Sequence, residues 1–144
     1  MSIKIGIKDL VNEATSNIST ISAKDAIARY GSASTVFVDV RDVRELYREG
    51  MIPNAFHSPR GMLEFWVDPS SPYHKDIFSD MEKVFVLYCQ SSWRSALATF
   101  TLKKMGMTNV KHLSGGLNAW KKLGGPIEKK EEKTSLNDSI ETTS

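Results

Sequence analysis

The chain has a single cysteine, Cys89, and an arginine, Arg94, stands five residues after it. Cys89 directly follows the apolar run VFVLY at residues 84–88, and a helical pattern begins a few residues later. The first N–H groups of a helix have no intrahelical partner, so a loop curling over a helix start forms an anion site. A sulfur at the rim of such a loop experiences positive potential, which favours the nucleophilic thiolate. The spacing therefore predicts a thiolate that attacks an anionic substrate.

The loop between the expected strand and helix supplies further polar groups. Arg94 adds a permanent positive charge, and the serines add hydroxyl donors. The candidate loop residues are Gln90, Ser91, Ser92, Trp93, Arg94 and Ser95. A purely structural Cys89 is the alternative, since free cysteine is among the residues most often buried. The position at a strand end and the following arginine favour a catalytic cysteine.

The composition is that of an ordinary globular protein. The 144 residues are 40% hydrophobic and 25% charged, and 19 basic against 17 acidic residues leave a net charge of +2. This balance argues against a nucleic-acid partner, and no apolar run is long enough to suggest a membrane partner. The N-terminal residues lack the apolar core of a signal peptide, so we expect a cytoplasmic protein whose lone thiol stays reduced.

One cysteine cannot form an internal disulfide or a cysteine-rich zinc site. The histidines His57, His74 and His112 share no metal-ligand spacing. We therefore expect no metal ion and no cofactor. If the loop already ionises Cys89, the chemistry also needs no histidine base, and we assign none of the three to the site.

Runs of β-branched residues alternate with helical patterns along the chain. The runs at residues 35–40 and 84–88 lack polar alternation, as in strands buried on both faces of a parallel sheet. Strands are expected at residues 35–40, 55–58, 84–88 and 109–113, and helices near residues 7–18, 22–31, 42–49, 93–105 and 116–123. This order predicts an α/β fold, doubly wound, with a mainly parallel central sheet and helices on both faces. Ligands of such sheets bind at the carboxyl ends of strands, where Cys89 lies.

The chain is expected to divide into three segments. Residues 1–18 form an N-terminal helical extension, residues 19–127 form the domain, and residues 128–144 form a disordered polar tail. The tail, EKKEEKTSLNDSIETTS, holds two scattered apolar residues, too few to bury the surface that would order it.

Four short motifs in order give the chain a resemblance to the rhodanese-like domain. They are DVRD at residues 39–42, GMIPNA at residues 50–55, CQSSWR at residues 89–94 and GGLNAW at residues 115–120. Glu45 is similar to the acid that usually follows the first motif. Met51 and Asn54 stand where the second family motif commonly has histidine and glycine. The resemblance covers roughly residues 18–126.

The resemblance implies sulfur transfer through a covalent intermediate. A small anionic donor such as thiosulfate gives its outer sulfur to Cys89 as a persulfide, and cyanide or a thiol, including a protein thiol, removes it. Loop amides would hold the transferred sulfur, and Arg94 would attract the donor. Asp39 and Arg41 are candidates for bracing the loop, with a fold-stabilising ion pair as the alternative. Arg60 is a candidate for lining the pocket, with a surface position as the alternative.

Two other functions stay open for this sequence. A persulfide carrier or binding module that serves a partner protein would use the same cysteine chemistry. A cysteine-dependent phosphatase would resemble the related C-x5-R loop, one residue longer than the C-x4-R spacing from Cys89 to Arg94. A shorter loop suits a sulfur atom better than a tetrahedral phosphate. Phe65, Trp66 and Tyr73 form either one wall of the active-site mouth or a separate apolar cluster.

Overall fold

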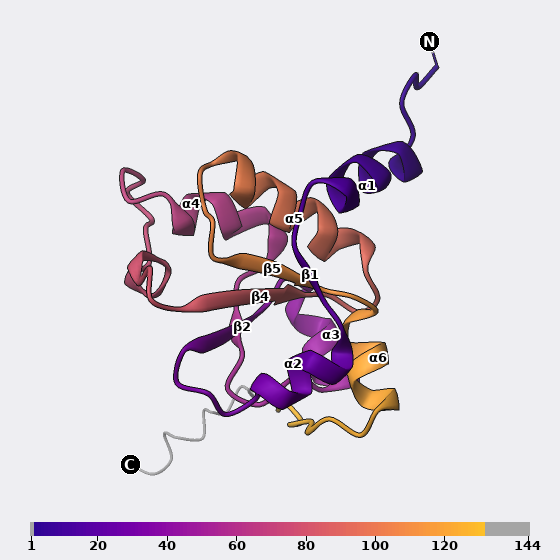
Figure 1. Ribbon diagram of the computed structural model, residues 1–144, viewed down its shortest axis with the longest axis vertical. Coiled ribbons are helices and arrows are strands. Elements are labelled where there is room, and N and C mark those ends of the chain that lie inside the picture. Colours follow the sequence, from indigo (N-terminus) through magenta and orange to yellow (C-terminus); the bar gives the residue numbers. More distant parts are fainter. Residues whose placement is uncertain (1, 132–144) are drawn as a thin grey trace, which may run out of the picture.

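A computed structural model describes residues 2–131 and has a central β-sheet between two layers of helices (Figure 1). Five strands of the described chain form the sheet in the spatial order β1-β5-β4-β2-β3, and every neighbouring pair is parallel. The strands are β1 Thr20–Ile21, β2 Thr35–Asp39, β3 Phe56–His57, β4 Val84–Tyr88 and β5 Val110–Leu113.

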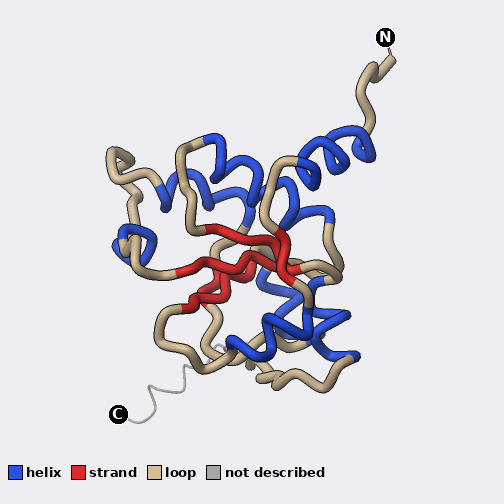
Figure 2. The backbone as a smooth tube through the Cα atoms, viewed as in Figure 1, coloured by secondary structure: helices blue, strands red, loops and turns tan. Residues whose placement is uncertain are grey.

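Helices cover both faces of the sheet, above and below the strands in Figure 2. The helices α4 and α5 lie on one face, with α1 packed against α5, and α2, α3 and α6 lie on the other. Their bounds are α1 Ile7–Ser16, α2 Ala23–Arg29, α3 Val43–Glu49, α4 Leu63–Val67, α5 Trp93–Lys104 and α6 Gly116–Lys122. Two short 3-10 helices, η1 Arg60–Met62 and η2 Asp76–Ser79, flank α4. The predicted doubly wound α/β fold is therefore confirmed.

The side chains of β4 contribute alternately to the two halves of the core. Phe85 and Leu87 belong to the apolar cluster on the α5 side, and Val86 and Tyr88 belong to the cluster that includes residues of α2 and α6. All four are completely buried. Burial on both faces explains why this strand reads as a continuous apolar run. By the same alternation, Cys89 belongs to the cluster on the α5 side.

One strand and one α-helix, besides the two 3-10 helices, were not predicted from the sequence. β1 is two residues long and pairs with β5 at the edge of the sheet. α4 is a five-residue helix that follows directly after η1. Segments this short contain too few residues to display a strand or helix period.

The first residue of the predicted polar tail pairs with the domain. Glu128 exchanges two backbone hydrogen bonds with Met51, with N···O distances of 2.8 and 2.9 Å. Residues 132–144 of that tail lie outside the described residues, so the division into extension, domain and tail stays a prediction. Across residues 2–131, no helix combines the length and apolar character needed to cross a membrane.

Candidate active site

Cys89 lies at the carboxyl end of β4, the middle strand of the sheet, where the chain turns into α5. Its side chain is 1% exposed and belongs to the same apolar cluster as Leu87 and Ala98. The sulfur is therefore at the base of the loop, not at the rim where the sequence analysis placed it. The reason is that the residue continues the inward alternation of the strand before the chain turns.

Two groups of Ser95 contact the cysteine sulfur. The Ser95 N–H donates to Cys89 Sγ over 3.4 Å, and Ser95 Oγ lies 3.5 Å from the same sulfur. Ser95 is the third residue of α5, so its N–H is one of the donors that a helix start leaves without an intrahelical partner. Donation from this N–H stabilises negative charge on the sulfur.

The first turn of α6 holds the carbonyl groups of the loop. The Leu117 N–H donates to Cys89 O at 2.9 Å, and the Asn118 N–H donates to Gln90 O at 3.0 Å. The C=O and N–H of a trans peptide point in opposite directions. Because these carbonyls face α6, the N–H groups of the same peptide units face away from it. That orientation is the one an anion-binding loop requires.

Gly116 permits this close approach because it has no side chain. Its φ is +57°, and a Cβ on it would lie 2.5 Å from Cys89 O, 2.8 Å from Gln90 O and closer still to Ser91 O. The preceding Gly115 N–H donates to the Ser92 hydroxyl oxygen at 2.9 Å. The two glycines of the GGLNAW motif therefore seat α6 against the loop.

Asp39, the last residue of β2, and Arg41, two residues later, form a fully buried ion pair. Arg41 Nε and Nη2 donate to the two Asp39 carboxylate oxygens at 2.9 and 2.7 Å. Arg41 Nη1 also donates to Gln90 Oε1 at 2.8 Å, and Nη2 donates to Gly50 O at 2.8 Å. Burial by itself lowers the pKa of Arg41, but the hydrogen bonds and charge of Asp39 outweigh it and raise the pKa overall. The Arg41 guanidinium therefore stays charged and connects the loop to β2 and to the end of α3.

Arg94 is paired with an acid from α3. Its Nη1 and Nη2 donate to the two Glu45 carboxylate oxygens at 2.7 and 3.0 Å. Glu45 also accepts the Asp42 N–H, which closes the capping box of α3. The hydrogen bond from Arg94 lowers the pKa of Glu45, and the same bond raises the pKa of Arg94. The loop motif predicted a permanent positive charge at Arg94, and in the structure the Glu45 carboxylate balances that charge.

Residues 22–123, which contain the cysteine loop and its supports, match the family model described as the rhodanese-like domain. The chain belongs to the rhodanese-like family. The family predicted from the four motifs is thereby confirmed.

Several known proteins are similar to this rhodanese-like chain. A solved structure from Rhodopseudomonas palustris, described as a protein of unknown function and possible tyrosine phosphatase, is 50% identical, has a TM-score of 0.86 and covers 89% of this chain and 98% of that one. A sulfurtransferase of Allochromatium vinosum is 33% identical over 64% of this chain and 77% of its own length. An uncharacterized Synechocystis protein is 38% identical over 67% of this chain and 48% of its own length, so the chain spans about half of that relative.

Arg60 lies on η1 of the rhodanese-like domain and is engaged with neighbouring helices. Its Nη1 donates to both Glu64 carboxylate oxygens at 2.8 Å, and its Nη2 donates to Thr101 Oγ1 at 3.2 Å. The guanidinium therefore links η1 to α4 and α5. Trp93, the first residue of α5, is 46% exposed, so its indole faces solvent at the helix start.

The three aromatic residues of undecided role separate into two groups. Phe65 and Tyr73 pack edge to face with ring centroids 6.5 Å apart, and both are more than half exposed. Trp66 packs against Phe56 at 5.9 Å, beside the apolar cluster on the α5 side. Trp66 therefore matches the apolar-cluster interpretation, and Phe65 and Tyr73 form an exposed pair.

His112 on β5 is a site residue that the sequence analysis missed. Its Nδ1 lies 2.9 Å from Ser95 Oγ, and the side chain is almost completely buried. Burial lowers the pKa of His112 to about 4, so the ring is neutral at pH 7. The available signal was a histidine at an inward position of the short strand VKHL, where an apolar residue is expected.

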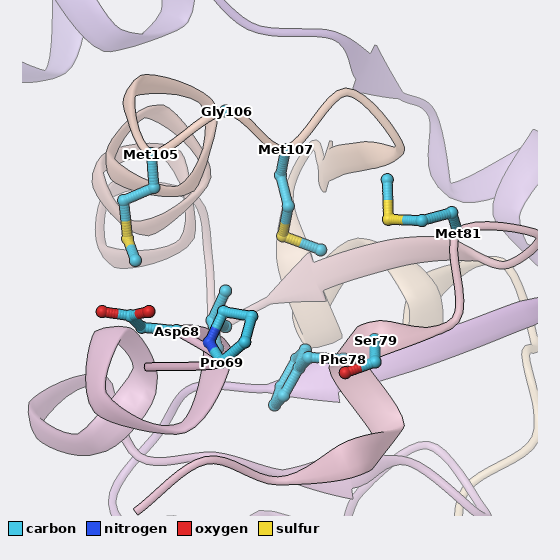
Figure 3. Close-up of a pocket in the computed structure, with 9 residues that line it drawn as sticks. Asp68, Pro69, Phe78, Ser79, Met81, Met105, Gly106 and Met107 are labelled. Atoms are coloured by element: carbon cyan, nitrogen blue, oxygen red, sulfur yellow. The ribbon is translucent and has the colours of Figure 1, made fainter. Parts of the chain in front are cut away.

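A cavity of about 500 Å³ opens at the opposite end of α5 from Cys89 (Figure 3). It is lined by Val67, Asp68, Pro69, Phe78, Ser79, Met81, Met105, Gly106 and Met107. The 12-residue helix between Cys89 and this cavity is roughly 18 Å long. The cavity is therefore separate from the cysteine loop.

Proposed function

We propose that the protein is a sulfurtransferase that moves a sulfane sulfur from a small anionic donor such as thiosulfate to a thiophilic acceptor through a persulfide on Cys89. The observation that carries the proposal is the setting of the sulfur: Cys89 ends the middle strand and its Sγ accepts the Ser95 N–H at 3.4 Å. The loop carbonyls are engaged by α6. Membership of the rhodanese-like family and similarity to a sulfurtransferase of Allochromatium vinosum support the same reading.

The reaction proceeds in two displacements. The Cys89 thiolate attacks the outer sulfur of thiosulfate, a new S–S bond forms, the S–S bond of thiosulfate breaks, and sulfite leaves with the electron pair. The carbon of cyanide, or the sulfur of an acceptor thiolate, then attacks the terminal sulfur. The persulfide bond breaks and its electron pair returns to Cys89. Ping-pong kinetics follow, because the first product leaves before the acceptor reacts.

The surrounding residues have separate roles in this proposal. The N–H groups of Gln90, Ser91 and Ser92 stabilise the negative charge of the terminal sulfur, as fixed donors do for a developing anion. Asp39 and Arg41 hold the loop through Gln90 and do not contact the donor. Arg94 attracts the anionic donor, which must compete with Glu45 for the guanidinium.

The name of the Rhodopseudomonas palustris protein gives a reason to test a phosphatase activity. A phosphate monoester would need the loop to wrap three oxygen atoms of a tetrahedral group. The spacing from Cys89 to Arg94 is C-x4-R, which leaves one amide fewer than the related C-x5-R loop. We therefore expect negligible phosphate release from small aryl phosphates.

A persulfide carrier for a partner protein uses the same chemistry and differs only in its acceptor. The proposal includes a protein thiol among the acceptors for this reason. The setting we expect is a reducing, cytoplasmic one, in which a lone thiol stays free.

Intact mass spectrometry after exposure to thiosulfate tests the proposal. We expect the protein to gain the mass of one sulfur atom, to lose it on addition of cyanide, and to gain nothing as the Cys89→Ser variant. An adduct that persists in Cys89→Ser would disprove the assignment of the nucleophile. Robust, Cys89-dependent hydrolysis of an aryl phosphate without sulfur loading would replace the proposal with the phosphatase.

A further inference from the structure

Cys89, Ser95 and His112 form a chain of contacts from the active loop into the sheet. Ser95 Oγ lies 3.5 Å from Cys89 Sγ and 2.9 Å from His112 Nδ1. It also lies 3.2 Å from the carbonyl oxygen of Ser92. All three side chains are at least 97% buried, since their exposed fractions are 1%, 0% and 3%. Bulk water therefore does not supply alternative partners freely.

The Ser95 hydroxyl has one hydrogen to give and several neighbours that can take it. A hydroxyl donates once and accepts up to twice, whereas a neutral imidazole nitrogen either donates or accepts. If His112 Nδ1 has no hydrogen, it takes the Ser95 hydrogen through the shortest of the contacts. The Ser95 oxygen then faces Cys89 as an acceptor, which suits a thiol S–H and not a thiolate.

The opposite tautomer of His112 reverses the direction of the hydrogen bonds that link it through Ser95 to Cys89. If His112 Nδ1 bears the hydrogen, it donates to Ser95 Oγ, and the Ser95 hydrogen is free for the sulfur. A thiolate then receives two donors from one residue, the Ser95 N–H at 3.4 Å and the Ser95 O–H at 3.5 Å. The Ser92 carbonyl competes for the same hydrogen, but a charged acceptor forms the stronger bond.

We propose that His112 is a positioning residue for Cys89: its Nδ1–H tautomer turns the Ser95 hydroxyl toward the sulfur and stabilises the thiolate. The role needs no charge on the ring. Burial, which keeps the ring neutral, is compatible with it. The place of His112 follows from the sheet, since β5 is the parallel neighbour of β4 and carries His112 opposite Leu87, two residues before the cysteine.

Charged side chains around the loop also affect Cys89, independently of the contacts through Ser95 and His112. Arg94 of α5 is close enough for its charge to interact with the sulfur, and Glu45 of α3 balances that charge. The Asp39–Arg41 pair lies at the carboxyl end of β2 and contacts the loop through Gln90. Variants of Ser95 and His112 keep all four of these side chains, so we expect a shift measured in those variants to report the hydroxyl chain.

The tautomer of His112 can be measured directly in the unsubstituted protein. We expect nitrogen-15 spectra of histidine-labelled protein to report Nδ1–H at His112 above the pH midpoint of Cys89 alkylation, and Nε2–H below it. In Cys89→Ser the tautomer should not change across this pH range. A His112 tautomer that stays the same on both sides of the midpoint in the unsubstituted protein overturns the proposal.

Substitutions provide the second test, read out as the pH profile of iodoacetamide reaction with the single cysteine. We expect His112→Leu and Ser95→Ala each to raise the alkylation midpoint by roughly one pH unit, the size of one hydrogen bond to a charged group. The double variant should shift no further, because His112 acts through Ser95. His112→Asn, which places an amide N–H near the Nδ1 position, should recover part of the shift.

His74→Asn is the matched control, because His74 bonds Ser79 instead of the loop, and it should keep the original profile. An unchanged profile in folded His112→Leu, or additive shifts in the double variant, overturns the proposal. The inference rests on the proposed function only in taking Cys89 as the reactive group. If thiosulfate still loads Cys89 while the tautomer stays constant, the inference fails and the sulfurtransferase proposal stands.

Discussion

Replacing Gly116 with alanine tests whether the contact between α6 and the loop organises the reactive site. The added Cβ would lie 2.5 Å from Cys89 O and 2.8 Å from Gln90 O, and closer still to Ser91 O. All three neighbours are backbone atoms of the loop, so no side-chain rotation relieves the overlap. Either the loop moves away from α6, or the start of α6 moves away from the loop.

The expected cost has two parts. Gly116 has a φ of +57°, and placing alanine in the left-handed region costs about 1 kcal/mol. Overlap with fixed backbone atoms adds about 1–3 kcal/mol, the usual range for overpacking. A total of about 2–4 kcal/mol corresponds to a fall in Tm of roughly 10 °C for a domain of this size. Moving catalytic groups by about 1 Å lowers a rate about a hundredfold. We therefore expect the rate of sulfur loading at Cys89 to show a larger effect than the Tm.

Gly124→Ala is the matched control for this substitution. Gly124 follows the other end of α6 with a φ of +80°, and among residues 2–131 no atom outside its chain neighbours lies within 4 Å of a Cβ built on it. It therefore shares the backbone strain without the overlap, and we expect a loss of about 1 kcal/mol and unchanged sulfur loading. The measurements are thermal unfolding and the time course of sulfur loading by intact mass. The reasoning would be refuted by a Gly116→Ala variant that takes up sulfur at the original rate and has the same Tm as Gly124→Ala.

Three further predictions concern charge, pH and the chain end. Glu45→Gln leaves the charge of its arginine partner unbalanced, so we expect kcat/KM for thiosulfate to rise about threefold at low salt and the gain to shrink at high salt; a slower variant would show that Glu45 is needed to hold that arginine. His112 has a pKa of about 4 in the folded state against 6.5 for an ordinary histidine. Between these values the unfolded chain binds a proton that the folded protein does not, so urea unfolding should show a loss of about 2 kcal/mol from pH 8 to pH 5 that is absent in His112→Asn. Removing residues 132–144 should leave the Tm unchanged, whereas removing residues 128–144 also deletes the Glu128–Met51 pairing and should cost about 1–2 kcal/mol; equal Tm values for the two truncations would contradict this.

Much of the fold could be predicted because most of its strands and helices have a recognisable pattern within a short segment of sequence. β4 occupies residues 84–88, as the apolar run predicted, and α5 begins at Trp93 within the expected range. α2 lies within the helix expected near residues 22–31, and Ser22 caps it by accepting the Asp25 N–H. In each case one short segment contains the whole signal, either a period, a cap or a stop.

The missed elements and residues lack such a local signal. β1 is a strand only because β5 lies beside it, and two residues have no period. Gly116 appeared in the sequence only as part of the GGLNAW motif, but its importance comes from three carbonyl oxygens of a loop about 25 positions earlier in the chain. His112 was compared with metal-ligand spacings, whereas its partner is a serine on the helix that follows the neighbouring strand.

The sequence by itself determined the α/β class, the rhodanese-like motifs and the position of Cys89 between a buried strand and a helix start, because those features depend on residues close together in the chain. The tertiary structure decided which groups surround the sulfur. Arg94 meets Glu45 and Gln90 meets Arg41 across 49 residues in each case, and both pairings arise because β2 and β4 are adjacent parallel strands whose carboxyl ends share one edge of the sheet. Ser95 meets His112 because β5 lies on the other side of β4. Strand order results from packing helices on both faces of the sheet, and no local pattern of residues encodes it.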